Sequence, residues 1–134
     1  MKRFETVEEA RAYFRNDRFA TENGVELDEL TEDGCVCHLD LTDSHRNALG
    51  GVMGGAIFTL ADFAFAVSSN NAHEGTVAID ISMQFLSAAK GSRLIARSTC
   101  AKDGRSTCVY QVEVTDDTGR KVALFTGTGF IPAK

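Results

Sequence analysis

The sequence predicts an α+β domain in which a curved antiparallel β-sheet wraps around one central α-helix. Three features lead to this prediction. Residues 54–67 are apolar on nearly every face of a helix, residues 76–131 alternate between apolar and polar side chains, and turn residues divide this second region into hairpins. A helix that is apolar all round needs protein around it, and a curved sheet supplies that enclosure.

The overall composition indicates one globular domain over residues 1–134. Apolar residues make up 43% of the chain and charged residues 25%, which are ordinary values for a folded domain. The formal net charge is −5, with 19 acidic and 14 basic side chains. Because phosphate backbones are bound by clustered Lys and Arg, we expect no nucleic-acid partner.

The N-terminus and the cysteines predict a cytoplasmic protein. The first residues are charged and lack the apolar stretch of a secretory signal. Since cytoplasmic thiols stay reduced, the four cysteines are expected to be free. The central helix is too short to cross a bilayer, so we expect no membrane partner.

The first half of the chain should hold one helix and one strand before the central helix. Residues 6–9, Thr-Val-Glu-Glu, have the form of a capping box and open an amphipathic helix over about residues 6–16. Residues 35–41 alternate as a strand does. Residues 42–53 show no period and should form the loop that leads into the central helix.

The second half should be a meander of antiparallel strands. The apolar residues from Val77 to Phe85 alternate strictly, and Asp103-Gly104 and Asp117-Thr118-Gly119 are typical hairpin turns. Gly127 and Gly129 share a strand face, which lets another part of the chain approach closely, so we expect the central helix there. The remaining strands are expected near residues 92–101, 106–115 and 121–131.

The loop and the start of the central helix carry a recognisable motif. It reads His45-Arg46-Asn47-Ala48-Leu49-Gly50-Gly51-Val52-Met53-Gly54-Gly55 and ends with Leu60-Ala61-Asp62. The motif resembles the signature of phenylacetate-degradation-type hotdog thioesterases, and the similarity runs from about residue 18 to the C-terminus. The resemblance implies the hotdog fold, hydrolysis of acyl-CoA thioesters, no cofactor beyond the coenzyme A of the substrate, and a homodimer or homotetramer with shared active sites.

Asp62 is the expected catalytic carboxylate, acting as a general base on water or as the nucleophile. It is the only ionisable side chain between Gly54 and Val67. A carboxylate in an apolar helix carries a desolvation penalty unless it has a partner, and such groups concentrate at functional sites. The alternative is a buried Asp that caps a neighbouring loop or pairs across a subunit interface.

The resemblance gives Gly54 the role of oxyanion donor, because its N–H would lie at the positive end of the helix. The missing side chain of Gly54 would let the acyl group approach, and Gly55 is expected among the substrate-binding residues. Asn47 would donate to the carbonyl or hold the attacking water. Without the motif, the glycines would indicate only a flexible helix entry and Asn47 an ordinary turn residue. Gly54 and Asn47 of one subunit are expected to face Asp62 of another.

Met53 departs from the family, which has a histidine before the glycine pair. A thioether accepts hydrogen bonds only weakly, so the rate or the substrate choice is expected to differ. His45 either binds the substrate through a phosphate, or orients the loop, or is exposed without a function. Coenzyme A carries phosphates, and the resemblance assigns these to Arg105 with Ser106, while Lys90 would assist. The alternative is that these are solvated turn residues.

No metal site is expected. The spacing in Cys35-Val36-Cys37-His38 is too short for a zinc pair and a second ligand pair is missing, so these residues should pack in the core. A two-residue hairpin at Asp103-Gly104 would place Cys100 and Cys108 on opposite sheet faces. His73 is expected to face solvent.

Two other functions stay open on the sequence alone. A non-catalytic acyl-CoA sensor would account for the loss of histidine at Met53 but not for a buried carboxylate at Asp62. A hotdog dehydratase would need a catalytic histidine near the site, where His45 is the only candidate. The identity of the acyl group is not predicted.

Overall fold

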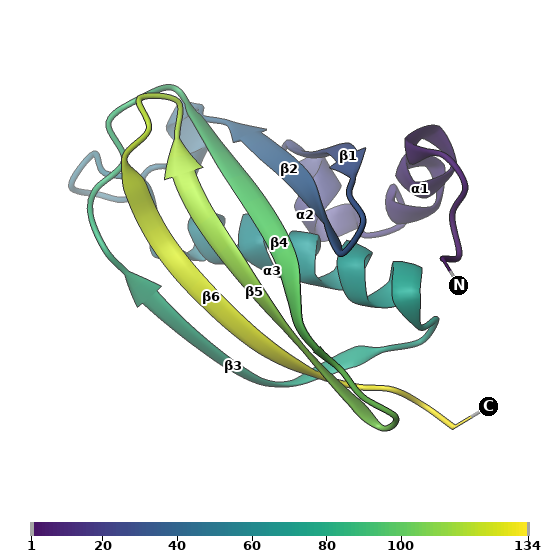
Figure 1. Ribbon diagram of the computed structural model, residues 1–134. Coiled ribbons are helices and arrows are strands. Elements are labelled where there is room, and N and C mark those ends of the chain that lie inside the picture. The colour runs from purple at the N-terminus through teal and green to yellow at the C-terminus, as the bar shows by residue number, and fades with distance from the viewer. Residues whose placement is uncertain (1, 134) are drawn as a thin grey trace.

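A six-stranded antiparallel sheet curves around one long helix in the computed structural model, which describes residues 2–133 (Figure 1). The order of the strands in the sheet is β1-β2-β4-β5-β6-β3. The predicted fold class is therefore confirmed. The elements are α1 (Val7–Phe14), α2 (Arg18–Glu22), β1 (Val25–Leu30), β2 (Gly34–Asp40), the 3₁₀ turn η1 (Asp43–His45), α3 (Gly54–Ala72), β3 (Val77–Phe85), β4 (Arg93–Asp103), β5 (Thr107–Asp116) and β6 (Lys121–Phe130).

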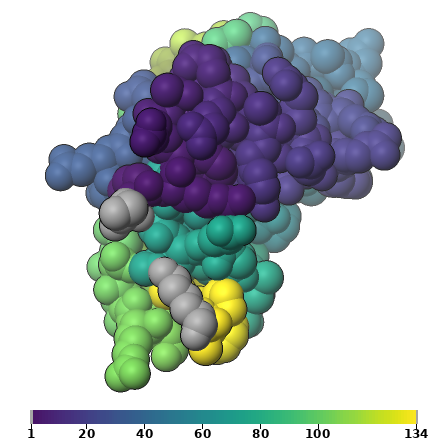
Figure 2. Space-filling view, turned by 90° about the vertical axis from the view of Figure 1, so that its right-hand side faces the viewer, coloured from purple at the N-terminus to yellow at the C-terminus, as the bar shows by residue number. Residues whose placement is uncertain are grey.

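The N-terminal region contains more structure than the sequence indicated. The hydroxyl of Thr6 accepts a hydrogen bond from the N–H of Glu9 at 3.1 Å, so the predicted cap of α1 is present. The helix α2 and the strand β1 were not predicted, because both are short and neither has a clear period. In Figure 2 the N-terminal residues pack together beside α3, and the β4–β5 hairpin extends in the direction away from them.

The predicted meander is correct only for β4, β5 and β6. The strand β3 pairs with β6 at the far edge of the sheet, and β2 pairs with β4. The alternation in β3 correctly predicts a strand but not a buried face, because Val77, Ile79 and Phe85 are each more than half exposed. The alternation of apolar residues shows which side chains of a strand share a face. It does not show which strand pairs with β3, because that depends on the path of the chain through the whole sheet.

The register of the β4–β5 hairpin also differs from the prediction. A bulge between Cys100 and Lys102 places Cys100 opposite Tyr110 instead of Thr107. Residues opposite each other in an antiparallel pair share a face, so Cys100 and Cys108 lie on the same face of the sheet. Both thiols are nevertheless free, as are those of Cys35 and Cys37.

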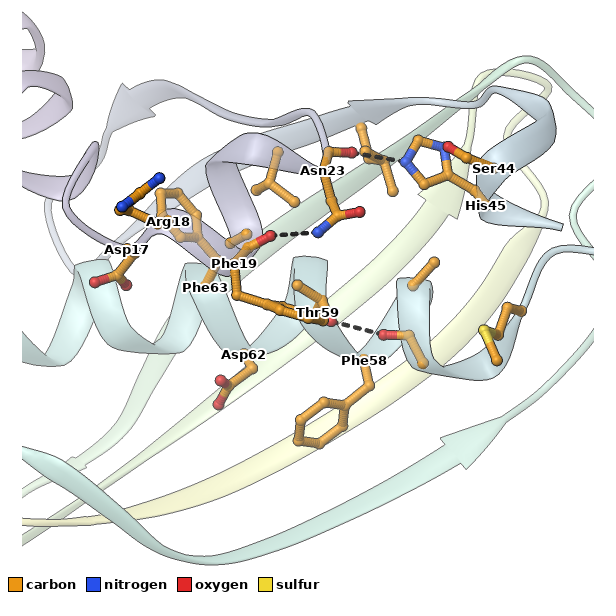
Figure 3. A pocket seen from close by; sticks show the side chains of 16 residues that line it. Asp17, Arg18, Phe19, Asn23, Ser44, His45, Phe58, Thr59, Asp62 and Phe63 are labelled. Atoms are coloured by element: carbon orange, nitrogen blue, oxygen red, sulfur yellow. Dashed lines mark hydrogen bonds between the residues drawn. The ribbon is translucent and has the colours of Figure 1, made fainter.

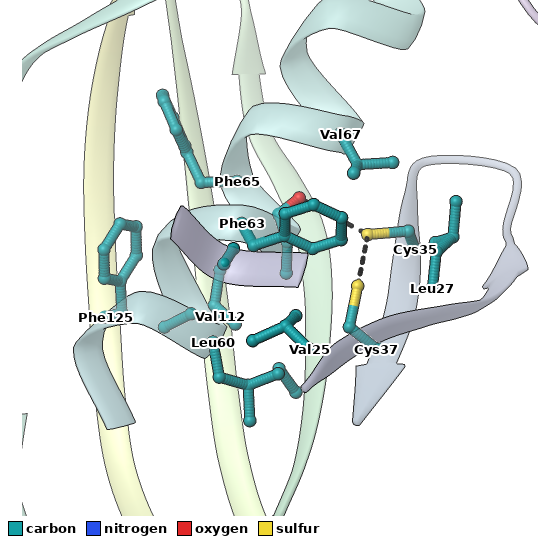
Figure 4. Close-up of a cluster of buried hydrophobic side chains, with 14 of the residues drawn as sticks. Val25, Leu27, Cys35, Cys37, Leu60, Phe63, Phe65, Val67, Val112 and Phe125 are labelled. Atoms are coloured by element: carbon teal, nitrogen blue, oxygen red, sulfur yellow. Dashed lines mark hydrogen bonds between the residues drawn. The ribbon is translucent and has the colours of Figure 1, made fainter. Parts of the chain in front are cut away.

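The core lies between α3 and the sheet (Figure 4). The ring of Phe65 approaches a Cβ built on Gly127 to 3.0 Å and one built on Gly129 to 3.2 Å, so the predicted contact between the central helix and these glycines is confirmed. The helix continues to Ala72 because its polar last turns are buried with partners: Asn71 Oδ1, for example, accepts from the N–H of Phe4 at 3.0 Å. No helix in residues 2–133 has the length and apolarity needed to cross a membrane.

Candidate active site

A pocket with a volume of about 730 Å³ runs along the N-terminal half of α3. Its walls come from α3, from the region of α2 and from the loop that precedes α3 (Figure 3). Most of the lining is apolar, and a few polar groups lie among the apolar ones. The lining residues are Asp17, Arg18, Phe19, Ala20, Asn23, Val25, Leu39, Ser44, His45, Met53, Gly55, Ala56, Phe58, Thr59, Asp62 and Phe63.

Asp62 lies in this pocket without a polar partner. Its carboxylate makes no hydrogen bond or ion pair with any side chain or backbone group of residues 2–133, and it points to the same side of α3 as Phe58 (Figure 3). Burial raises the pKa of Asp62, and the negative charge of Asp17 raises it further. The alternative of a loop cap therefore finds no partner in the described chain, and the alternative of a pair across a subunit interface stays a prediction. A free carboxylate in an apolar pocket can accept a proton from water.

The start of α3 presents unpaired N–H groups next to the pocket. The carbonyl of Met53 accepts from Ala56 and Ile57, whereas the N–H groups of Gly54 and Gly55 have no acceptor in the described chain. These donors lie at the positive end of the helix dipole. A Cβ at position 54 would lie 3.3 Å from the ring of Phe85, so a larger residue there would require this exposed ring to shift.

His45 is buried, so the alternative of an exposed and idle histidine is wrong. The N–H of Thr42 donates to His45 Nδ1 at 3.0 Å. The other ring nitrogen, Nε2, therefore carries the proton and donates to the carbonyl of Asn23 at 2.7 Å. His45 thus fastens the loop before α3 to the end of α2, and both of its nitrogens are occupied.

Asn47 and Met53 are both exposed, and only Met53 lines the pocket. Asn47 Oδ1 accepts from the N–H groups of Leu49 and Gly51 at 3.0 and 3.1 Å, which shapes the loop. These bonds occupy the amide oxygen and leave the amide NH₂ of Asn47 available as a donor. The side chain of Met53 lies at the pocket wall, at the position where a histidine was expected.

The proposed phosphate contacts do not line the pocket of their own chain. Arg105 and Ser106 form the exposed β4–β5 turn, and Lys90 is exposed in the segment before β4. These positions flank opposite ends of β4, so one small anion within a single subunit cannot contact both Lys90 and Arg105.

Asp17 and Phe19 line the pocket but were not predicted as site residues. Asp17 is the N-cap residue of α2, but its side chain makes no capping hydrogen bond. Burial raises the pKa of Asp17. Phe19 is 75% exposed although it is a large apolar residue. An Asp before a short helix and an aromatic residue after it are common, so the sequence carried no distinctive signal.

The remaining cysteines and histidines are as follows. Cys35 and Cys37 are buried, with their sulfur atoms 3.8 Å apart, as expected for core residues. His73 does not simply face solvent, because its Nε2 lies 2.6 Å from Asp103 Oδ1 and joins the end of α3 to β4.

Comparison with known proteins identifies the family. The thioesterase superfamily matches residues 49–123, a segment that includes α3, its N-terminal glycines and Asp62. The chain belongs to this superfamily. A putative esterase of Archaeoglobus fulgidus is 31% identical over 129 residues, covering 95% of this chain and 84% of the relative.

Two further proteins are similar to this chain in sequence and structure. The acyl-coenzyme A thioesterase PaaI of Escherichia coli is 31% identical over 119 residues, covering 88% of this chain and 85% of PaaI. The structure of E. coli PaaI superposes with a TM-score of 0.87, at 28% identity over 94% of this chain and 92% of PaaI. A hypothetical thioesterase of Streptococcus pneumoniae, solved with coenzyme A, superposes with a TM-score of 0.82 at 26% identity, over 90% of this chain and 98% of that protein.

Proposed function

We propose that this thioesterase-superfamily protein hydrolyses acyl-CoA thioesters to a free acid and coenzyme A. The observation that carries the proposal is the unpartnered carboxylate of Asp62 in an apolar pocket of about 730 Å³ beside the N-terminus of α3. The acyl-CoA thioesterase activity named for the E. coli relative supports the same substrate class.

In the proposed reaction a water molecule adds to the thioester carbonyl and the C–S bond breaks. Asp62 takes the proton from that water and returns it to the departing thiolate; alternatively Asp62 attacks directly and water cleaves the resulting anhydride. The N–H of Gly54 stabilises the negative oxygen, and the free amide NH₂ of Asn47 assists from the loop. The apolar lining holds the acyl group, with Gly55 and Met53 at the entrance.

We further propose that the active site is completed by a second copy of the chain. Within one subunit Asn47 does not reach the pocket that holds Asp62. No strand of residues 2–133 lies beside the outer edge of β3, and large apolar side chains are exposed on and near it, which is unfavourable in an isolated subunit. A symmetric dimer would cover them. These side chains are Val77, Ile79, Phe85 and Leu86, together with Phe130 of β6.

The test is a panel of acyl-CoA substrates with detection of the released thiol. Asp62→Asn keeps the size of the side chain and removes the charge, so we expect kcat to fall by about 10²–10⁴ and more if Asp62 is the nucleophile. Asp33→Asn, an exposed residue in the β1–β2 turn, is the matched control and should match the wild type. Unchanged turnover in Asp62→Asn would overturn the mechanism, and tight binding without turnover by the wild type would indicate a sensor.

A further inference from the structure

Three carboxylates surround one buried histidine on the face of the sheet that is turned away from α3. His38 is only 7% exposed. Its Nδ1 lies 2.7 Å from both carboxylate oxygens of Asp28. Its Nε2 lies 3.4 Å from Glu26 Oε2 and 3.7 Å from Asp40 Oδ2. This cluster joins β1 to β2 on the sheet face opposite the core side chains Cys37 and Leu39, and it has no part in the hydrolytic site.

The hydrogen bonds of the cluster leave Nε2 of His38 without a partner, next to two carboxylates, and a cation could bind at this point. A carboxylate only accepts, so the Nδ1–H of His38 donates to Asp28, and in the neutral ring the lone pair of Nε2 points outward. Nε2 makes no hydrogen bond within residues 2–133. One ligand atom from each of His38, Glu26 and Asp40 lies within 4.8 Å of the others. These three acceptors converge, and the only donor to any of them in the described chain is the guanidinium of Arg93, which bonds Asp40 from the side of β4. A cation between them would be attracted by all three.

We propose that Glu26, His38 and Asp40 bind a divalent transition-metal cation such as Zn²⁺. Tetrahedral zinc with bonds of about 2.0–2.1 Å holds its ligands roughly 3.3–3.4 Å apart, close to the separations around Nε2. Asp28 completes the arrangement, because a metal-bound histidine usually donates its second N–H to a carboxylate. A mixed imidazole and carboxylate set suits zinc better than magnesium or calcium, which take oxygen ligands.

The charges around the cluster fit a divalent ion. Arg93 on β4 lies opposite Asp40 and donates to it through Nε at 2.7 Å and a terminal nitrogen at 3.2 Å. The positive charge of Arg93 balances one of the three carboxylates, so these four groups have a net charge of −2. The three protein ligands leave the fourth zinc position for water, and the bound ion would tie the edge strand β1 to β2.

The other two histidines lack this arrangement and provide the control. His45 uses both ring nitrogens in hydrogen bonds. His73 faces one carboxylate, that of Asp103, with 2.6 Å between Nε2 and Oδ1. His73→Gln therefore removes a histidine–carboxylate pair of similar distance that has no converging third ligand.

The experiment is titration calorimetry of the full-length protein, freed of metal by a chelator, with Zn²⁺ alone. We expect one equivalent to bind, saturable binding to be lost in His38→Gln, and affinity to fall about 10–100-fold in Asp28→Asn. His73→Gln should bind as the wild type does. Circular dichroism checks the fold, and Glu26→Gln, at a mostly exposed side chain, provides a second test that does not disturb the core.

The proposal fails if the wild type binds no zinc at millimolar concentration, or if His38→Gln and Glu26→Gln both bind it as the wild type does. It also fails if His73→Gln loses the ion to the same extent. None of these readouts depends on acyl-CoA hydrolysis, so the outcome is separate from that of the proposed function.

Discussion

Asp17 and Asp62 both border the pocket, and their repulsion should add to the effect of burial on the pH dependence of the reaction. Asp62 acts in its ionised form, and the charge of Asp17 adds to the effect of burial in raising the pKa of Asp62. Asp17→Asn removes that charge, so the pKa of Asp62 should fall. We expect the acidic limb of the profile of kcat/KM against pH to shift to lower pH in this variant. An unchanged limb, or a shift to higher pH, would contradict the coupling.

The same shift links Asp62 to stability. The folded-state pKa of Asp62 is raised, so folding favours its protonated form. The contribution of Asp62 to the free energy of unfolding is therefore greatest at low pH and declines as pH rises through the raised pKa. At neutral pH the ionised carboxylate of Asp62 lowers the free energy of unfolding, which is consistent with a residue that has a role in catalysis.

A third residue-scale prediction concerns the phosphates of coenzyme A. Arg105 is exposed in a turn outside the pocket of its own chain, so its proposed partner is a remote part of the substrate. Arg105→Ala should raise KM for acyl-CoA much more than it lowers kcat, because the lost contact is the same in the ground state and the transition state. Acyl-pantetheine, which lacks the nucleotide, should show no change. Equal effects on both substrates would refute the phosphate assignment.

The sequence located Asp62 because the charge stands alone in an apolar helix. It did not reveal that His45 is buried and hydrogen-bonded, because the partner of its Nε2, the carbonyl of Asn23, lies 22 residues earlier in the chain. Asp17 was missed for the same reason, since its place beside the pocket depends on how α2 packs near α3. A residue's type and its local pattern can be read from the sequence, whereas its distant contacts need the fold.

At the scale of elements, one carboxylate organises the β5–β6 turn. Asp116 Oδ1 accepts from the N–H groups of Thr118 and Arg120 and from the Thr118 hydroxyl, while Oδ2 accepts from the N–H of Lys90. The side chain thereby joins the turn to the segment before β4. The hydroxyl of Thr118 and these N–H groups hold the pKa of Asp116 well below its usual range.

Asp116→Ala should lower the free energy of unfolding by more than about 2 kcal/mol, measured by urea denaturation, because several hydrogen bonds to a buried charge are lost together. Asp116→Asn keeps one acceptor oxygen and should lose less. Since the folded-state pKa is depressed, the stabilisation is present at neutral pH and disappears as pH falls from the ordinary carboxyl range through the depressed pKa. Equal stability of Asp116→Ala and wild type would show that the turn holds without the carboxylate.

The elements themselves were predicted better than their arrangement. The strands β2 to β6 and the central helix were recognised because each has a clear period or turn signal. The placement of β3 beside β6 and the bulge after Cys100 were not, since both depend on pairings between strands far apart in sequence.

For the molecule as a whole, the two edges of the sheet differ. The guanidinium of Arg11 from α1 donates to the carbonyls of Leu27 and Asp28, so α1 occupies part of the β1 edge. The β3 edge has no such cover and carries exposed apolar side chains. The strict alternation of β3 gives it one apolar face, and an assembly of subunits would bury that face.

The last prediction tests this assembly through Ile79, which is 59% exposed at the bulge of β3. Ile79→Lys puts a charge on the edge where a second copy is proposed to bind, so we expect light scattering to show a monomer where the wild type is a dimer or larger. If Asn47 and Gly54 act across the interface, kcat should fall with the oligomer. Glu32→Lys in the β1–β2 turn adds a lysine away from β3 and should change neither. A monomeric Ile79→Lys variant with wild-type kcat would show that one chain forms the complete active site, because Asp62 would then need no partner subunit.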